Sequence, residues 1–122
     1  MDLAFAQKFA TEWQDAWNSH DLDRILAHYG EDVTFSSPMI ERFNGDPSGR
    51  VRGKAALREY WSTGLSRMPD LHFEVMDVRA GVDSLVIDFR NQFGGRVYEV
   101  LTFRGDRIIA GFGAYGTVPA AH

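Results

Sequence analysis

Residues 17–38, with the sequence WNSHDLDRILAHYGEDVTFSSP, contain the change from helix to strand that decides the fold of this chain. Asp21 suits the start of a short helix, because its carboxylate can accept a hydrogen bond from the first free amides. Gly30 suits the end of that helix, where a left-handed residue is common. The residues that follow alternate between apolar and polar side chains. This pattern predicts a short strand that ends before Pro38 and directs three side chains to one face: Val33, Phe35 and Ser37.

Two further helices are expected on either side of this stretch. Along the N-terminal residues, apolar side chains recur at steps of three and four, as on one face of a helix: Phe5, Phe9, Trp13, Ala16 and Trp17. Gly53–Arg67 predicts another helix, with an inner face made by Leu57, Trp61 and Leu65 and with Tyr60 beside them. Between the strand and this helix, Met39–Arg52 is rich in glycine and proline, and we expect it to form a loop.

The C-terminal half of the chain predicts a sheet. Four segments alternate between apolar and polar residues: Asp70–Arg79, Leu85–Gln92, Val97–Arg104 and Arg107–Tyr115. Gly94-Gly95 and Gly105-Asp106 mark turns between them, as in β-hairpins. Helices followed by an antiparallel meander are typical of an α+β fold, in which the helices pack on one face of the sheet.

Composition limits the classes of protein to which this chain belongs. Its 122 residues suit one domain, which we expect to span residues 1–116 with a short tail at 117–122. A net charge of −4 without a basic run argues against nucleic acid or an anionic membrane as a partner. The sequence has no cysteine and no metal-ligand spacing of histidines, so we expect no metal and no other cofactor. No targeting or membrane-spanning segment is visible, which favours a cytoplasmic protein.

Several short motifs occur along nearly the whole chain: Trp13-x-x-x-Trp17-Asn18, Asp21-Leu22-Asp23, Tyr29-x-x-Asp32-Val33-x-Phe35-x-x-Pro38, Gly53-x-x-Ala56-Leu57-x-x-Tyr60-Trp61, Pro69-Asp70-Leu71-x-Phe73 and Glu99-Val100-Leu101-x-Phe103. In these motifs the chain resembles SnoaL-like members of the nuclear transport factor 2-like and ketosteroid isomerase-like superfamily. The resemblance implies a cone-shaped α+β barrel. In it, three N-terminal helices pack against a strongly curved, mostly antiparallel sheet that encloses a deep apolar pocket. It also implies a homodimer formed through the outer face of the sheet.

Glu99 is the candidate catalytic residue. It alternates in phase with Val97, Leu101 and Phe103, so its carboxylate is directed to the apolar side of the sheet. Burial there raises the pKa of a carboxylic acid, which can then transfer protons near neutral pH. The resemblance places Glu99 where steroid isomerases carry the acid of their oxyanion hole. The alternative is a structural carboxylate that accepts hydrogen bonds from an indole or a tyrosine hydroxyl.

Ser37 and Trp13 argue against steroid isomerase chemistry. The resemblance places Ser37 where those isomerases carry their base and Trp13 where they carry a tyrosine of the oxyanion hole. A serine hydroxyl needs a base of its own to react, and an indole donates a hydrogen bond but does not titrate. We therefore expect Ser37 to bind a ligand oxygen or to cap its own turn.

The expected pocket combines many aromatic side chains with a few polar ones: Trp13, Trp17, Tyr29, Phe35, Ser37, Tyr60, Trp61, Phe73, Phe89, Asn91, Phe103 and Tyr115. Gly111 and Gly113, which share the inward face with Tyr115, are expected to enlarge it. The sequence favours a protein that binds a small, largely apolar organic molecule, with Glu99 in proton-transfer chemistry such as isomerisation, cyclisation or dehydration. A noncatalytic ligand-binding or dimerisation module is the alternative. Epoxide hydrolysis is a third interpretation, for which a second inward carboxylate would be needed.

Alternation also predicts an apolar outer face of the sheet: Tyr98, Val100, Thr102, Ile108, Ala110 and Phe112. Exposed apolar surfaces of this size commonly mark interfaces. The pattern thus agrees with the two-fold homodimer that the resemblance implies.

Overall fold

The computed structural model describes residues 1–116, and the predicted tail at 117–122 lies outside the described residues. Its elements in chain order are α1 (Leu3–Ser19), α2 (Leu22–Leu26), β1 (Tyr29–Ser36), α3 (Pro38–Asn44), β2 (Arg50–Arg52), α4 (Lys54–Arg67), β3 (Glu74–Ala80), β4 (Ser84–Arg90), β5 (Arg96–Arg104) and β6 (Arg107–Tyr115). Helices thus dominate the first half and strands the second, which confirms the predicted α+β class.

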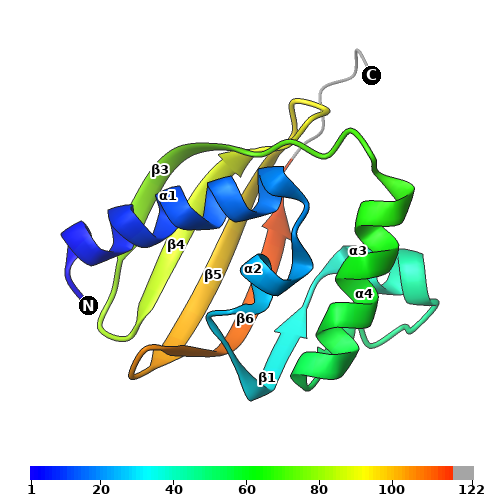
Figure 1. The fold of residues 1–122 in the computed structure, drawn as a ribbon, viewed down its shortest axis with the longest axis horizontal. Helices are drawn as coiled ribbons and strands as arrows, with labels where there is room; N and C mark the ends of the chain where they lie inside the picture. Colours follow the sequence, from blue (N-terminus) through cyan, green and yellow to red (C-terminus); the bar gives the residue numbers. More distant parts are fainter. Residues whose placement is uncertain (117–122) are drawn as a thin grey trace.

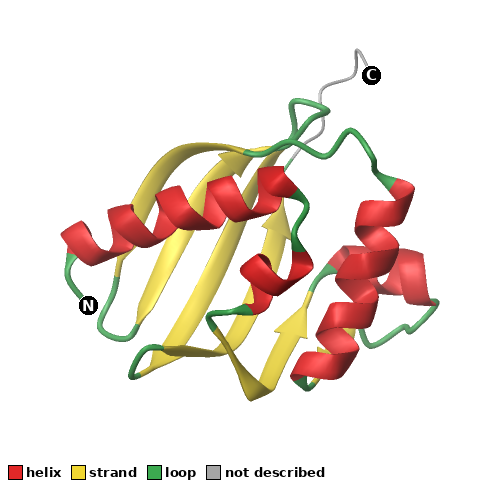
Figure 2. Cartoon of the chain, viewed as in Figure 1, coloured by secondary structure: helices red, strands yellow, loops and turns green. Residues whose placement is uncertain are grey.

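The strands form a single mixed sheet in the order β2-β1-β6-β5-β4-β3. β1 runs parallel to β6, and every other neighbouring pair is antiparallel. Figure 1 shows α1 lying across β3, β4 and β5, with α4 beside β1, while Figure 2 shows the sheet curling around these helices without closing. The helices therefore cover one face of the curled sheet.

Polar side chains of α1 form hydrogen bonds with the backbone of Phe73 and Val75, just before and within the edge strand β3. The Asn18 amide donates to the carbonyl of Phe73 over 2.9 Å and accepts from the amide of Phe73 over 2.8 Å. One turn earlier, the Gln14 side chain accepts from the amide of Val75 over 2.7 Å. These bonds satisfy backbone groups that an uncovered edge would leave to solvent, and they fix the inward face of α1 over the sheet.

The structure corrects the prediction that Met39–Arg52 is a loop, because this segment contains most of α3 and all of β2. Ser37 is the N-cap of α3, and its Oγ accepts a hydrogen bond from the amide of Met39 over 3.2 Å. Pro38 occupies the first helical turn, and Gly45 ends the helix in the left-handed region with φ 71°. The sequence thus contains a helix start and a helix end, which the glycine and proline residues after them obscured.

The helix–strand boundary before β1 also differs from the prediction. α2 ends at Leu26, and Tyr29 is the first residue of β1, where it pairs with Ile108 of β6. Gly30 is therefore a strand residue and not the end of the helix. The apolar residues of this short segment are spaced as in a helix, but pairing with β6 places the last of them, Tyr29, in a strand.

A bulge in β6 moves Ile108 to the core face of the sheet. Thr102 pairs with Ala110 whereas Phe103 pairs with Ile108, so Ile109 is an extra residue on the β6 side. Ile108 is completely buried as a result. The prediction that Ile108 lies on the outer face is wrong, because strict alternation fails wherever a strand carries an extra residue.

Trp61 of α4 lies at the centre of the aromatic core. Its ring centroid is 4.9 Å from that of Trp17, 5.2 Å from that of Tyr29 and 5.4 Å from that of Phe35, each pair packing edge to face. These rings join α1, β1 and α4 into one layer over the sheet. Aromatic pairs at these separations add stability beyond the area that they bury, so they help to hold α1 and α4 against β1.

Candidate functional site

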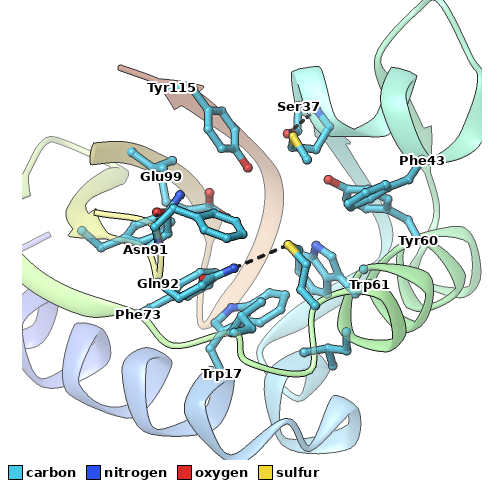
Figure 3. Close-up of a pocket in the computed structure, with 18 of the residues that line it drawn as sticks. Trp17, Ser37, Phe43, Tyr60, Trp61, Phe73, Asn91, Gln92, Glu99 and Tyr115 are labelled. Atoms are coloured by element: carbon cyan, nitrogen blue, oxygen red, sulfur yellow. Dashed lines mark hydrogen bonds between the residues drawn. The ribbon is translucent and has the colours of Figure 1, made fainter. Parts of the chain in front are cut away.

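The curled sheet and the helices leave a cavity of about 320 Å³. Its lining is mostly aromatic and aliphatic: Trp13, Trp17, Phe35, Ser37, Met39, Arg42, Phe43, Tyr60, Trp61, Gly64, Leu65, Met68, Leu71, Phe73, Phe89, Asn91, Gln92, Phe93, Val97, Glu99 and Tyr115. Figure 3 shows side chains from α1, α3, α4 and the strands directed into one common space. An apolar cavity with a few polar groups is the usual form of a small-molecule site.

Most side chains of the expected pocket line this cavity: Trp13, Trp17, Phe35, Ser37, Tyr60, Trp61, Phe73, Phe89, Asn91, Glu99 and Tyr115. Tyr29 and Phe103 do not. Tyr29 packs behind Trp61, and Phe103 packs edge-on against Phe9 of α1 with ring centroids 5.3 Å apart. Both are therefore core residues rather than residues of the cavity wall.

Glu99 is a buried carboxylic acid in the wall that β5 contributes. It pairs with Ile87 of β4 on one side and with Gly113 of β6 on the other, and only 6% of its surface is exposed. Within residues 1–116, its carboxylate forms neither a hydrogen bond nor an ion pair. Burial raises the pKa of Glu99 to about 8, because the charged form loses its hydration without gaining a partner. At neutral pH this residue is mainly in the acid form and can donate a proton.

Three hydroxyl groups lie on the side of the cavity toward α3. Ser37 is buried, and its hydroxyl interacts with the hydroxyls of Tyr60 and Tyr115, which partly offsets the effect of burial on the pKa of each tyrosine. Burial still raises the pKa of Tyr115 to about 12 and raises the pKa of Tyr60 further. Tyr115 as a whole residue is 44% exposed, while Figure 3 shows its hydroxyl directed inward. All three groups are neutral near pH 7 and serve as hydrogen-bond donors or acceptors.

Asn91 and Gln92 belong to the β4–β5 turn and already have partners in the protein. The Asn91 Oδ1 atom accepts hydrogen bonds from the amides of Phe93 and Gly95, each over 3.0 Å. The Gln92 amide nitrogen donates to the sulfur of Met68 over 3.6 Å, a contact drawn in Figure 3. Asn91 thus shapes the turn, and its oxygen is not free to accept from a ligand.

Three buried donors have no hydrogen-bond partner in the described part of the chain: Trp13 Nε1, Trp17 Nε1 and the Tyr29 hydroxyl. Burial raises the pKa of Tyr29 well above its usual value, and the nearby Glu99 raises it further. An unpaired buried donor costs about 1–3 kcal/mol, which an added acceptor can recover. Trp13 and Trp17 line the cavity with other atoms of their side chains, because both indole nitrogens are themselves buried.

Gly111 and Gly113 have different roles, although the sequence predicts that both enlarge the pocket. A Cβ atom on Gly111 would lie 3.0 Å from Leu101 Cδ2 and 3.1 Å from Phe35 Cδ2, so glycine here permits close packing of the core. Gly113 instead faces Glu99 and Tyr115. The structure therefore corrects the role of Gly111, whereas Gly113 lies next to two residues of the cavity wall.

The sequence-based list of pocket residues lacked the wall made by α3. Met39, Arg42 and Phe43 all line the cavity, and Arg42 and Phe43 lie three and four residues after Met39, on the same side of the helix. Treating Met39–Arg52 as a loop hid that spacing, although the Ser37-Pro38 start signal was present. The other missed side chains come from α4, from the segments that follow α4 and β4, and from β5: Gly64, Leu65, Met68, Leu71, Gln92, Phe93 and Val97.

No group of three or more potential metal-ligating side chains occurs within residues 1–116. No helix in the same part of the chain is both long enough and apolar enough to cross a membrane.

Comparisons with known proteins identify the family. A family model for the SnoaL-like domain matches residues 10–111. The crystal structure of a SnoaL-like protein of unknown function from Burkholderia thailandensis is 46% identical to this chain, with a TM-score of 0.90 and coverage of 95% of this chain and 98% of that chain. No curated protein matches the sequence.

More distant solved structures share the fold. TerC, co-crystallised with polyporic acid, has a TM-score of 0.75 at 12% identity, and the match covers 91% of each chain. A protein of unknown function with a cystatin-like fold from Methylobium petroleophilum has a TM-score of 0.74 at 17% identity, covering 99% of this chain and 82% of that chain. At such low identities the likeness extends to the fold alone.

Proposed function

Since this chain belongs to the SnoaL-like domain family, whose fold places a cavity inside a curled sheet, we propose that it binds a small, largely apolar organic molecule there and catalyses proton transfer next to a carbonyl group. Isomerisation, cyclisation and dehydration are reactions of this class. One observation carries the proposal: Glu99 is a buried acid in the cavity wall without a partner in the described chain. An unpaired buried carboxylic acid is costly to maintain, and a functional role accounts for that cost.

The size of the cavity supports a ligand of modest dimensions. An apolar cavity of about 150 Å³ can accept benzene. The cavity of about 320 Å³ in this protein therefore has room for roughly two fused rings. The aromatic wall formed by Trp13, Trp61 and Phe73 suits a flat molecule, because ring faces and edges gain dispersion energy from close contact.

Glu99 alone can supply both proton transfers that convert a ketone into its enol. Its acid form donates a proton to the carbonyl oxygen, and the carboxylate that results accepts a proton from the adjacent carbon. The Glu99 proton is thereby restored, and the carbon–oxygen double bond is exchanged for a carbon–carbon double bond. Ser37, Tyr60 and Tyr115 can hold the oxygen atom, because their hydroxyls are neutral at the pH at which Glu99 is an acid.

Two alternative reactions receive less support from the lining. Steroid isomerase chemistry needs a base, and Ser37 is instead the cap of α3. Epoxide hydrolysis by paired carboxyl groups needs a second acid, whereas Glu99 is the one carboxylate among the described lining residues. A noncatalytic binding protein would use the same cavity, and experiments on Glu99 distinguish it from an enzyme.

We also propose that the protein forms a homodimer through the outer face of its sheet. Tyr98 is 49% exposed and Phe112 is 45% exposed on this face, and Val100, which pairs with Phe112, lies between them. Two large exposed rings on neighbouring strands form an apolar surface that a second copy of the chain would cover.

The proposed function is tested by the titration of Glu99 and by the contents of the purified protein. Carbon NMR of protein labelled at the glutamate carboxyl groups should show one group that titrates near pH 8 and shifts when a ligand fills the cavity. Native mass spectrometry of the purified protein should detect any small apolar molecule that remains bound. A Glu99 that titrates near its usual value and does not respond to ligands would overturn the catalytic role.

A further inference from the structure

Arg42 supplies the one permanent charge among the described residues that line the cavity. It belongs to the face of α3 that also carries Met39 and Phe43, so helical geometry directs it toward the same space. Arg42 is exposed to solvent whereas Glu99 is buried, so Arg42 lies at the mouth of the cavity and Glu99 lies inside it. The cavity thus has a positive charge at its mouth and, in its wall, a buried acid with the side chains of Ser37 and Tyr115 beside it.

The guanidinium of Arg42 is not neutralised by the described part of the protein. It forms no hydrogen bond or ion pair within residues 1–116, unlike Arg24, which is bound by Glu12. Its neighbour Glu41 does not line the cavity. The guanidinium of Arg67 lies over the ring of Phe43, 5.4 Å from its centroid, so a second positive charge is next to a residue of the cavity wall, although Arg67 itself does not line the cavity.

From this arrangement we infer that the ligand carries an anionic group, of the carboxylate class, which binds Arg42 at the mouth while the carbonyl end of the ligand reaches Glu99. This inference rests on the proposed function, because it assigns a ligand class to the same cavity. A carboxylate can accept two parallel hydrogen bonds from a guanidinium, so the pair fixes orientation as well as adding affinity. The deep end would exclude such a group, because apolar walls and the Glu99 acid offer a carboxylate no compensating charge.

A matched pair of probes tests the inference. The first is a naphthalene carboxylic acid with an acetyl group on the far ring, and the second is the corresponding carboxamide, which has the same shape without the charge. Calorimetry gives the dissociation constant of each probe. Quenching of tryptophan emission reports whether it occupies the cavity, because Trp13, Trp17 and Trp61 all line the wall.

We expect the wild-type protein to bind the acid about three- to tenfold more tightly than the amide, the range for a partly exposed charge-assisted pair. Arg42→Gln should remove this preference by weakening acid binding alone, and Arg42→Lys should retain part of it. The control is Arg104→Gln, an exposed arginine at the end of β5 outside the cavity lining, which should leave both constants unchanged. Added salt should reduce the preference for the acid.

Two contrary outcomes have different meanings. If both probes bind equally well, or if Arg42→Gln weakens both to the same degree, the assignment of an anionic ligand is overturned while the proposed binding function stands. If neither probe binds or quenches the tryptophan emission, the cavity does not accept ligands of this class. The proposed function and the inference then fail together.

Discussion

Gly113 on β6 pairs with Glu99 on β5, and a methyl group on Gly113 would lie 3.3 Å from the Oε1 atom of Glu99. The same methyl group would lie 3.4 Å from Cε1 of Tyr115 and 3.9 Å from Oγ of Ser37. The missing side chain thus leaves the space around which the acid and two hydroxyl groups gather. Gly111, two residues earlier, has a different role, because it permits Phe35 and Leu101 to pack closely.

Alanine substitutions at the two glycines should separate these roles. Gly111→Ala should lower the free energy of unfolding by about 1–3 kcal/mol, because the added methyl group overpacks the core. Gly113→Ala should change stability less, because it meets the ends of movable side chains, yet it should weaken binding of an acetylnaphthalene probe about tenfold by displacing Glu99. Chemical denaturation and calorimetry measure the two effects. The opposite ranking would show that Gly113 is the packing residue.

The proposed dimer makes a prediction about charge on the outer face of the sheet. Tyr98→Glu and Phe112→Glu should each convert a dimer into a monomer, because a buried, unpaired carboxylate opposes association. Val82→Glu is a suitable control, since Val82 is 93% exposed and lies in the turn between β3 and β4. Sedimentation velocity at micromolar concentration measures the state. A wild-type protein that is already monomeric under these conditions would rule out the proposed interface.

The sequence predicts the fold class well because helical and strand periodicities are segregated along the chain. Alternation places Glu99 correctly on the inner face, since β5 carries no bulge from Arg96 to Thr102, where it pairs with β4 and β6 in an unbroken register. The same rule fails for Ile108, because one extra residue in β6 reverses the direction of every side chain before it. Bulges depend on the pairing of distant strands and leave little signal in local sequence.

The candidate site is predicted less completely than the fold. The sequence expectations include the aromatic wall, because large apolar residues on inward faces are recognisable from spacing alone. They lack Arg42, since the glycine and proline residues after α3 conceal a helix with a serine cap and a proline start. They also include Phe103, whose side chain shares the inward face with Glu99 but packs under α1, away from the cavity. The two side chains point to the same face of β5 but lie at different positions along the strand. Alternation gives the face to which a side chain points and does not give what packs against that part of the face.

The raised pKa of Glu99 predicts a specific pH dependence of stability. With a pKa of about 8 in the folded protein and a usual value of 4.5, Glu99 keeps its proton in the folded state through a range in which the unfolded chain has lost it. The contribution of Glu99 to the free energy of unfolding is therefore fully present below about pH 4.5 and is lost as the pH rises toward about pH 8. Over that range the free energy of unfolding falls by up to roughly 1.4 kcal/mol per unit of pH.

Glu99→Gln should remove this contribution to the slope. The variant and the wild type should differ least near pH 5 and most near pH 9, with the variant the more stable at the higher pH. Urea denaturation at a series of pH values measures the difference. Parallel profiles for the two proteins would mean that Glu99 has the same pKa in the folded and unfolded states.

Glu99→Gln also tests catalysis without knowledge of the natural substrate. In deuterated water, the wild-type protein should accelerate deuterium uptake into the methyl group of an acetylnaphthalene, which proton NMR follows directly. The variant should bind the probe with an affinity within about fivefold of wild type, because the amide keeps the shape of the acid. Its exchange rate should fall by a factor on the order of a hundred, since an amide does not transfer protons. Equal exchange rates would favour the noncatalytic binding protein.

Glu99→Leu should give a folded protein that is more stable than wild type and inactive in the exchange assay. The carboxylate has no partner in residues 1–116, so its removal leaves no polar group unpaired, and an apolar side chain suits the surrounding wall. Replacement of a buried ionisable group by an apolar one can stabilise a protein by about 1–4 kcal/mol, and the gain should be larger at pH 8 than at pH 5. Glu59→Leu, at an exposed position on α4, is the control and should change stability by less than about 0.5 kcal/mol. Thermal unfolding of both variants and the wild type at the two pH values measures these differences in stability. A Glu99→Leu protein that unfolds or aggregates would make Glu99 a structural requirement of the sheet and remove the main reason to assign chemistry to this cavity.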